Sequence, residues 1–272
     1  MTAVNIIDLF GYQFFQNALI GGCIAAVACA VVGLFLILKK EAMIGDGLSH
    51  TAFGGIALGL FLGINPLLTA LAISIIAVFA ISYMRRKGVA PSDSAIAVML
   101  ALGFSTGLIV ISLAYGFNVE LFSYLFGSIL TIDQIDLLLV ALLGFAALIF
   151  IGILRREILS IVFDEDDSKV MGIPTKTLSM AFDLLVAITI VLSIKVIGTI
   201  LVVALLVIPG LTALKLNVSF RKTIIAAIGF SIVSTIFGII LSAVLDIATG
   251  GLIVFISVAF FGLTYVYKKL GN

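Results

Sequence analysis

The chain has 272 residues, of which 63% are hydrophobic and only 11% are charged, and its formal net charge is +1. A soluble domain has about 45–50% apolar and about 25% charged residues, so this composition could not cover a water-soluble fold of the same size. The same composition excludes disorder, and the small net charge points to no nucleic-acid partner. We therefore expect an all-α polytopic membrane protein that forms a single transmembrane domain over residues 1–272.

Basic clusters divide the chain into long apolar segments. With the N-terminus outside, alternate crossing places every basic cluster on the cytoplasmic side, as the positive-inside rule requires. Lys195 is then the basic residue left near the outer face. The segment 178–214 can be divided differently, which leaves eight spans as an alternative to nine. The predicted spans are residues 15–38, 45–62, 67–84, 94–115, 137–154, 178–194, 198–214, 223–245 and 252–267.

Two further predictions concern a short segment between spans and an acidic residue within one span. Residues 121–130 are too few to cross the membrane, so we expect a short outer-side or re-entrant helix there. Such a helix must be buried in protein, because lipid cannot satisfy its exposed backbone ends. Asp183 falls near the cytoplasmic end of its span, where we expect an interfacial position.

Asp46 and His50 form the main candidate metal site. His50 is the only histidine, and Asp46 precedes it by four residues, so on a helix both side chains share one face. A carboxylate and an imidazole together can bind a divalent transition metal. The alternative is an Asp–His hydrogen bond that satisfies two buried polar groups. Two ligands are fewer than zinc requires, so another helix, water or a second copy would complete the site.

The longest polar segment is cytoplasmic and covers about residues 155–177. Four consecutive acids, at 164–167, stand where they suit the N-terminal dipole of a short helix. Gly172 and Pro174 are typical of the end of that helix. The segment is either a solvated loop or a docking helix for a cytoplasmic partner.

No G-x-x-x-x-G-K-[ST] phosphate loop occurs in the chain, and no H-E-x-x-H or G-x-S-x-G motif occurs either. We therefore expect a transporter subunit and not an enzyme. If ATP drives it, a separate chain must hydrolyse the ATP. An autonomous secondary carrier or channel is the rival class, but the halves of the chain show no convincing internal repeat.

Four segments resemble the membrane (permease) subunit of bacterial ABC-type zinc and manganese importers. The similarity runs in order from about residue 10 to residue 268. The segments are MIGDGLSH at 43–50, YLFGSI at 124–129, FDE at 163–165 with MGIP at 171–174, and VIGTIL at 196–201 followed by IP at 208–209.

The resemblance implies a helical fold like that of type II vitamin importers, located in the bacterial cell membrane. It also implies a homodimer, two cytoplasmic ATPase subunits that bind ATP, and an extracytoplasmic metal-binding protein. Asp46 and His50 match the metal-contacting pair, and the ion is Zn2+ or Mn2+, with zinc favoured by the forms at 124–128 and 163–166. This chain binds no cofactor of its own. The residues that match the family's coupling helix are Asp164, Glu165, Asp166, Asp167, Ser168 and Gly172.

Overall fold

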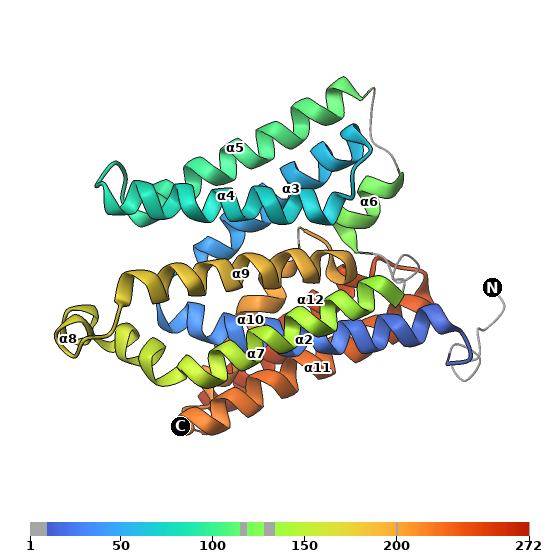
Figure 1. Cartoon of the computed structure of the whole chain (residues 1–272). Helices are drawn as coiled ribbons and strands as arrows, with labels where there is room; N and C mark the ends of the chain where they lie inside the picture. The colour runs from blue at the N-terminus through green and yellow to red at the C-terminus, as the bar shows by residue number, and fades with distance from the viewer. Residues whose placement is uncertain (1–9, 115–118, 128–133, 200, 272) are drawn as a thin grey trace.

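The computed structural model describes residues 10–114, 119–127, 134–199 and 201–271. In these ranges the chain is built from helices and short turns, with no strand (Figure 1). The predicted all-α architecture is confirmed. The helices are α2 (Gln13–Leu38), α3 (Met43–Leu62), α4 (Pro66–Arg86), α5 (Ser92–Leu113), α6 (Val119–Phe126), α7 (Gln134–Phe163), α8 (Glu165–Val170), α9 (Thr175–Ile197), α10 (Val202–Lys215), α11 (Phe220–Leu245) and α12 (Thr249–Gly271).

Seven of the described helices are long and apolar enough to cross a membrane: α2, α4, α5, α7, α9, α11 and α12. The other two predicted spans are also helices. The α3 helix has 20 residues but carries Asp46, Ser49 and His50, which lower its hydropathy. The α10 helix has only 14 residues, about 21 Å at the usual rise, which is shorter than the hydrocarbon layer. The segment 178–214 is thus divided into α9, which ends at Ile197, and α10, which begins at Val202.

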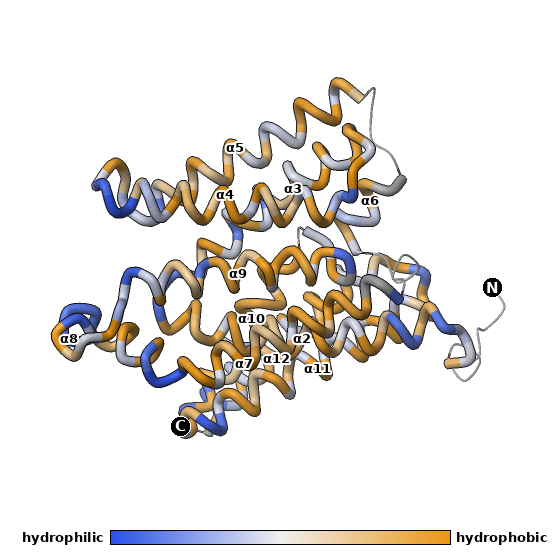
Figure 2. Tube along the Cα trace, viewed as in Figure 1, coloured by the Kyte–Doolittle hydropathy of each residue, from blue (hydrophilic) through white to orange (hydrophobic). Residues whose placement is uncertain are grey.

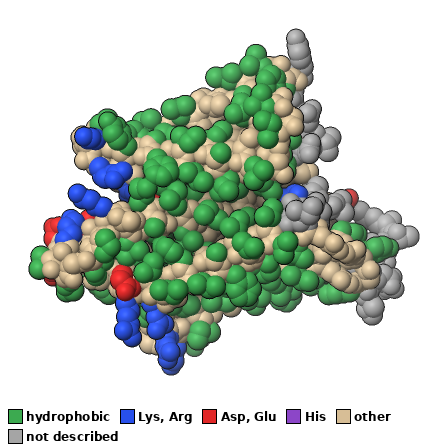
Figure 3. Space-filling view, in the orientation of Figure 1, with side chains coloured by type: hydrophobic (Ala, Val, Ile, Leu, Met, Phe, Trp, Pro, Cys, Tyr) green, Lys and Arg blue, Asp and Glu red, His purple; other side chains and the backbone are tan. Residues whose placement is uncertain are grey.

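The charged residues mark one end of the molecule. Figure 2 shows that hydrophobic residues predominate along the helices, and in Figure 3 most of the visible Lys and Arg side chains gather at the end that holds α8 and the C-terminus. The α7 helix has 30 residues, about 45 Å, so it extends well beyond the predicted span 137–154 and carries α8 away from the apolar layer. This arrangement agrees with the predicted cytoplasmic side.

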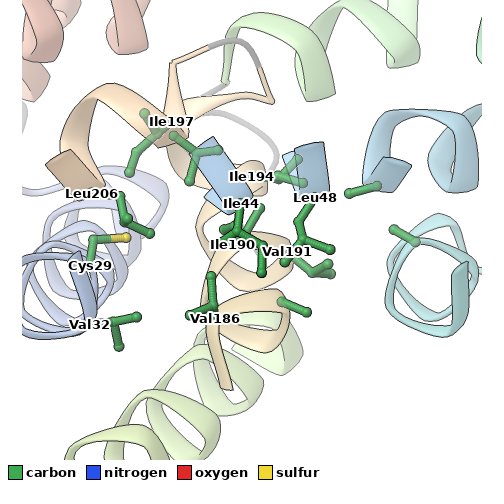
Figure 4. Close-up of a cluster of buried hydrophobic side chains, with 14 of the residues drawn as sticks. Cys29, Val32, Ile44, Leu48, Val186, Ile190, Val191, Ile194, Ile197 and Leu206 are labelled. Carbon is green, nitrogen blue, oxygen red and sulfur yellow. The ribbon is translucent and has the colours of Figure 1, made fainter. Parts of the chain in front are cut away.

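The helices pack in two groups. In Figure 1, α3, α4 and α5 lie together above α9, while α2, α7, α10, α11 and α12 lie below it. Glycines allow close contact within the first group: a Cβ on Gly54 would stand 2.4 Å from the Gly103 carbonyl oxygen, and one on Gly55 would stand 2.6 Å from the Ala70 Cα. The groups meet in an apolar core in which Ile44 and Leu48 of α3 face α9 (Figure 4).

The short helix α6 covers part of the predicted segment 121–130, and residues 128–133 lie outside the described residues. Its C-terminal end packs on the turn between α9 and α10. The Thr199 amide donates a hydrogen bond to the Tyr124 carbonyl at 2.9 Å. Gly198 has φ +91°, and a Cβ there would stand 2.3 Å from the Leu125 carbonyl oxygen. The segments 124–129 and 196–201, two of those that resemble the importer family, are far apart in sequence but therefore meet in space.

Candidate functional site

Asp46 and His50 lie together on α3, as the sequence predicted. The His50 Nε2 and Asp46 Oδ1 atoms are 3.6 Å apart, and the side chains are 30% and 40% exposed. Over the first two turns of α3, Met43, Asp46 and His50 form the only strip that is not buried. Their spacing of three and four residues places them on one helical face. The pair therefore occupies an open strip on a helix that is otherwise packed in protein.

Close contacts on the other sides hold α3 in this rotation. A Cβ on Gly47 would stand 2.6 Å from the Ile96 Cγ2 atom of α5, so only glycine permits this approach. The His50 ring packs edge-on against Phe104 of α5, with ring centroids 5.3 Å apart. On the opposite side, Ile44 and Leu48 are fully buried in the core shown in Figure 4. The packing buries the other faces of this part of α3, so the Asp46 and His50 side chains remain available to bind an ion.

The pair supplies only two ligands from one chain. Among the described residues, no group of three or more His, Cys, Asp or Glu side chains is placed to hold a metal ion. Zinc sites usually have four ligands, and harder divalent ions prefer six oxygen or nitrogen ligands. Chemically, the strip can bind a divalent ion weakly or share it with groups from elsewhere.

The predicted docking helix is α8, and its local sequence explains its bounds. The Asp164 carboxylate accepts hydrogen bonds from the Asp166 and Asp167 amides at 2.9 and 3.0 Å, which caps the helix N-terminus. Gly172, with φ +81°, and Pro174 end the turn that follows. Six residues form the helix, and the predicted segment is therefore an ordered element and not an unstructured loop.

One face of α8 is anchored and the other is exposed. The Ser168 side chain is buried and lies 2.8 Å from the Ser160 hydroxyl of α7. On the exposed face, Lys169 pairs with Asp166 at 2.9 Å and with Glu165 at 3.2 Å. The hydrogen bond from Lys169 lowers the pKa of the Asp166 carboxyl, and the same bond raises the pKa of Lys169.

Three apolar residues at the two ends of α8 were not among the predicted docking residues. Phe163, Val170 and Met171 are 85%, 88% and 72% exposed. Large apolar side chains standing in water next to a charged helix are typical of a protein-binding surface. In the sequence, the available signal was the apolar type of these residues on either side of the polar segment 164–169, whereas their exposure came only from the structure.

Asp183 lies in the N-terminal part of α9, the part next to α8, and its side chain is fully buried within the protein. Its carboxylate pairs with Arg85 of α4 and lies 3.7 Å from the Lys39 ammonium at the end of α2. Glu41 pairs with the same two cations, Lys39 at 2.8 Å and Arg85 at 3.0 Å. We call Lys39, Glu41, Arg85 and Asp183 the charge cluster. Separate predictions for each residue could not find it, because three helices and a linker contribute to it.

Comparison with known proteins identifies the family. The profile of the ABC 3 transport family matches residues 11–268. The chain belongs to the ABC 3 transport family. This confirms the resemblance to ABC metal-importer permeases inferred from the sequence and the location in the cell membrane as a multi-pass protein.

Relatives and a solved structure agree with this assignment. The chain is 30% identical over 261 residues to the manganese transport system membrane protein MntC of Halalkalibacterium halodurans, covering 96% of this chain and 89% of that one. It is 32% identical over 265 residues to a probable iron transport system membrane protein of Haemophilus influenzae, covering 97% of each. The structure of PsaBC from Streptococcus pneumoniae in complex with Fab matches with a TM-score of 0.86 at 30% identity, covering 98% of this chain and 99% of that chain.

Proposed function

We propose that this ABC-family permease conducts a divalent transition metal ion into the cell, with Asp46 and His50 as transient ligands. The observation that carries the proposal is the open strip of α3, where a carboxylate and an imidazole lie 3.6 Å apart on a tightly packed helix. Polar groups at membrane depth are costly and are typical of substrate pathways. An incomplete ligand shell suits a transit site, because the ion must also leave.

The partly exposed pair supports a homodimer. Asp46 and His50, 40% and 30% exposed, would face lipid in an isolated chain, which is unfavourable for such side chains. A second copy placed against this strip would cover the four side chains and bring two carboxylates and two imidazoles to one ion. This number of ligands matches the usual coordination of a transition metal.

The α8 surface supports docking to a cytoplasmic ATPase subunit. The acids at 164–167 suit a basic partner surface, and Phe163, Val170 and Met171 suit an apolar groove. Because α8 is anchored to α7 through Ser168 and leads directly into α9, a push on α8 would reach the spans. An extracytoplasmic binding protein would deliver the ion at the opposite face. Membership of an ABC family favours this ATP-driven mechanism over an autonomous carrier.

The choice of ion stays a proposal. Carboxylate and imidazole ligands suit both zinc and manganese. The sequence forms at 124–128 and 163–166 favour zinc, whereas the Halalkalibacterium halodurans relative is named for manganese. We propose manganese as the main ion, with zinc as the second candidate. Uptake of each radioactive ion in competition with the other would separate the two.

The test measures ion uptake by cells that express the chain with its partner subunits. Asp46→Ala and His50→Ala should each reduce uptake by at least about tenfold, because each removes a ligand. The matched control is Asp93→Ala, which removes an exposed carboxylate of α5 that is not a member of the pair. Normal uptake by both site variants at normal expression would contradict the site. Uptake that continues without the ATPase subunit would favour the autonomous carrier.

A further inference from the structure

The charge cluster is a second polar site, and the metal pair does not explain it. Its two cations are shared between its two carboxylates: Lys39 lies 2.8 Å from Glu41 and 3.7 Å from Asp183, while Arg85 lies 3.0 Å from Glu41 and also pairs with Asp183. The Lys39 ammonium also lies 4.9 Å from the centroid of the Phe182 ring. Two positive and two negative charges balance, as burial requires.

One side of the cluster leads to α8. Asp183 lies eight residues, about two turns, after the start of α9 at Thr175. The Thr175 hydroxyl donates to the Glu165 carboxylate of α8 at 3.5 Å, and Ser168 fastens α8 to α7. A displacement of α8 therefore reaches the start of α9 and, through that rigid helix, Asp183.

The other side of the cluster leads to the metal pair. Glu41 stands between α2 and α3: its amide donates to the Leu36 carbonyl at 3.0 Å, and its carbonyl accepts from the Ile44 amide at 3.0 Å. Asp46 follows in the first turn of α3, about one and a half turns after Glu41. Movement of the Glu41 side chain relative to its partners would therefore tilt or rotate the end of the helix that carries Asp46 and His50.

The pairing pattern allows such movement without an unpaired charge. Each cation touches both carboxylates, so one contact can lengthen while the other shortens. A cavity of about 290 Å³ adjoins Glu41 and Arg85 on the side of Glu165 and Lys176, which leaves room for the side chains to rearrange. Packed apolar contacts lack this freedom, because interdigitated side chains have few alternative arrangements.

We infer that the charge cluster is the joint that transmits movement of α8 and α9 to the metal pair of α3. Its four members act as positioning residues, since they hold α3 relative to α4 and α9 and do not touch the ion. This inference rests on the proposed function. It adds a route from the coupling helix to the transit site that the family assignment does not provide. A cluster with only a structural role would be replaceable by apolar side chains of similar size.

The experiment compares neutral, conservative and control variants in the assembled complex with its ATPase and binding protein. The neutral pair Arg85→Met with Asp183→Leu removes one cation and one anion together, so no net charge is left buried. The conservative variant Arg85→Lys keeps the charge. The control Lys222→Met removes an exposed charge at the start of α11 on the same side of the membrane. Ion uptake and ATP hydrolysis are measured per assembled complex.

We expect the neutral pair to hydrolyse ATP while its uptake falls at least about tenfold, a loss of transport of about 1.4 kcal/mol in the coupling step. Arg85→Lys should recover part of that uptake, and Lys222→Met should transport normally. Two results would contradict the inference that the charge cluster transmits movement. The first is uptake by the neutral pair within twofold of the unmutated complex, and the second is a parallel fall of uptake and hydrolysis.

A second variant covers the case in which the neutral pair does not assemble. Glu41→Gln removes one partly exposed charge of the cluster and keeps the shape of the side chain. It is judged by the same ratio of uptake to hydrolysis, and a normal ratio overturns the inference. Failure of the proposed function would look different, because the unmutated complex itself would then take up no metal ion.

Discussion

Two polar sites lie near the same end of α3, and they differ in how many opposite charges their groups contact. Within the described residues, the Lys39 Nζ, Glu41 Oε2 and Asp183 Oδ1 atoms of the charge cluster make ion pairs but no hydrogen bond. The metal pair is partly exposed and has two ligands from this chain, whereas the charge cluster is largely buried and each of its groups contacts two opposite charges. An incomplete site can accept an ion, and a complete one can hold helices together. The degree of ion pairing thus distinguishes the metal pair, which is suited to binding the substrate ion, from the charge cluster, which is suited to holding the helices together.

The largest effect on stability should come from removing one charge of the charge cluster. Asp183→Asn would leave Arg85 and Lys39 with a single carboxylate in a buried environment, which costs about 3–5 kcal/mol of unfolding free energy. Thermal unfolding of the purified protein in detergent measures this loss. The control is Asp46→Asn, the same chemical change at the partly exposed site. Equal unfolding temperatures for the two variants would contradict the distinction between the sites.

A smaller effect is expected where α3 is held against α5. In Gly103→Ala the new Cβ would stand 2.4 Å from the Thr51 Cα, so the two helices must separate. Such overpacking costs about 1–3 kcal/mol. Because Thr51 adjoins His50, the affinity for the ion should weaken as well, which the concentration dependence of uptake would reveal. Gly229→Ala of α11 is the matched control, since nothing lies within 4 Å of the Cβ added there. If Gly103→Ala were as stable as the unmutated protein, the close contact between α3 and α5 would be contradicted.

The smallest effect on stability should come from the incomplete site. His50→Ala removes a partly exposed ring that makes one aromatic contact, so the unfolding free energy should change by only about 0.5 kcal/mol. Uptake should nevertheless fall strongly, as proposed above. Thermal unfolding and uptake of the same preparation test the two parts together. A loss of stability like that of Asp183→Asn would mean that His50 serves the fold and not the ion.

Local patterns predicted part of this structure well. The spacing of Asp46 and His50 was sufficient to place them together, because an α-helix brings residues four apart onto one face. The acids at 164–167, followed by Gly172, predicted a short helix through capping and turn preferences. Both predictions depended only on neighbours in the sequence.

Predictions that depended on distant neighbours were less successful. The ion partners of Asp183 could not be predicted, because Lys39 and Arg85 reach it from α2 and α4. The predicted span 137–154 did not reveal that the α7 helix continues to Phe163, where α8 follows. Exposure of Phe163 could not be predicted, since it depends on what packs beside it.

The sequence by itself determined the membrane environment, the family and the local geometry of the Asp46–His50 pair, and its basic clusters predicted an orientation. These properties follow from composition and from helix periodicity, which act over a few residues. Only the tertiary structure decided which face of α3 stays open and which charges meet beside the start of α3. Those outcomes depend on how helices far apart in the chain pack, and the contact of Gly47 with Ile96 and the pairing of Arg85 with Asp183 illustrate that dependence.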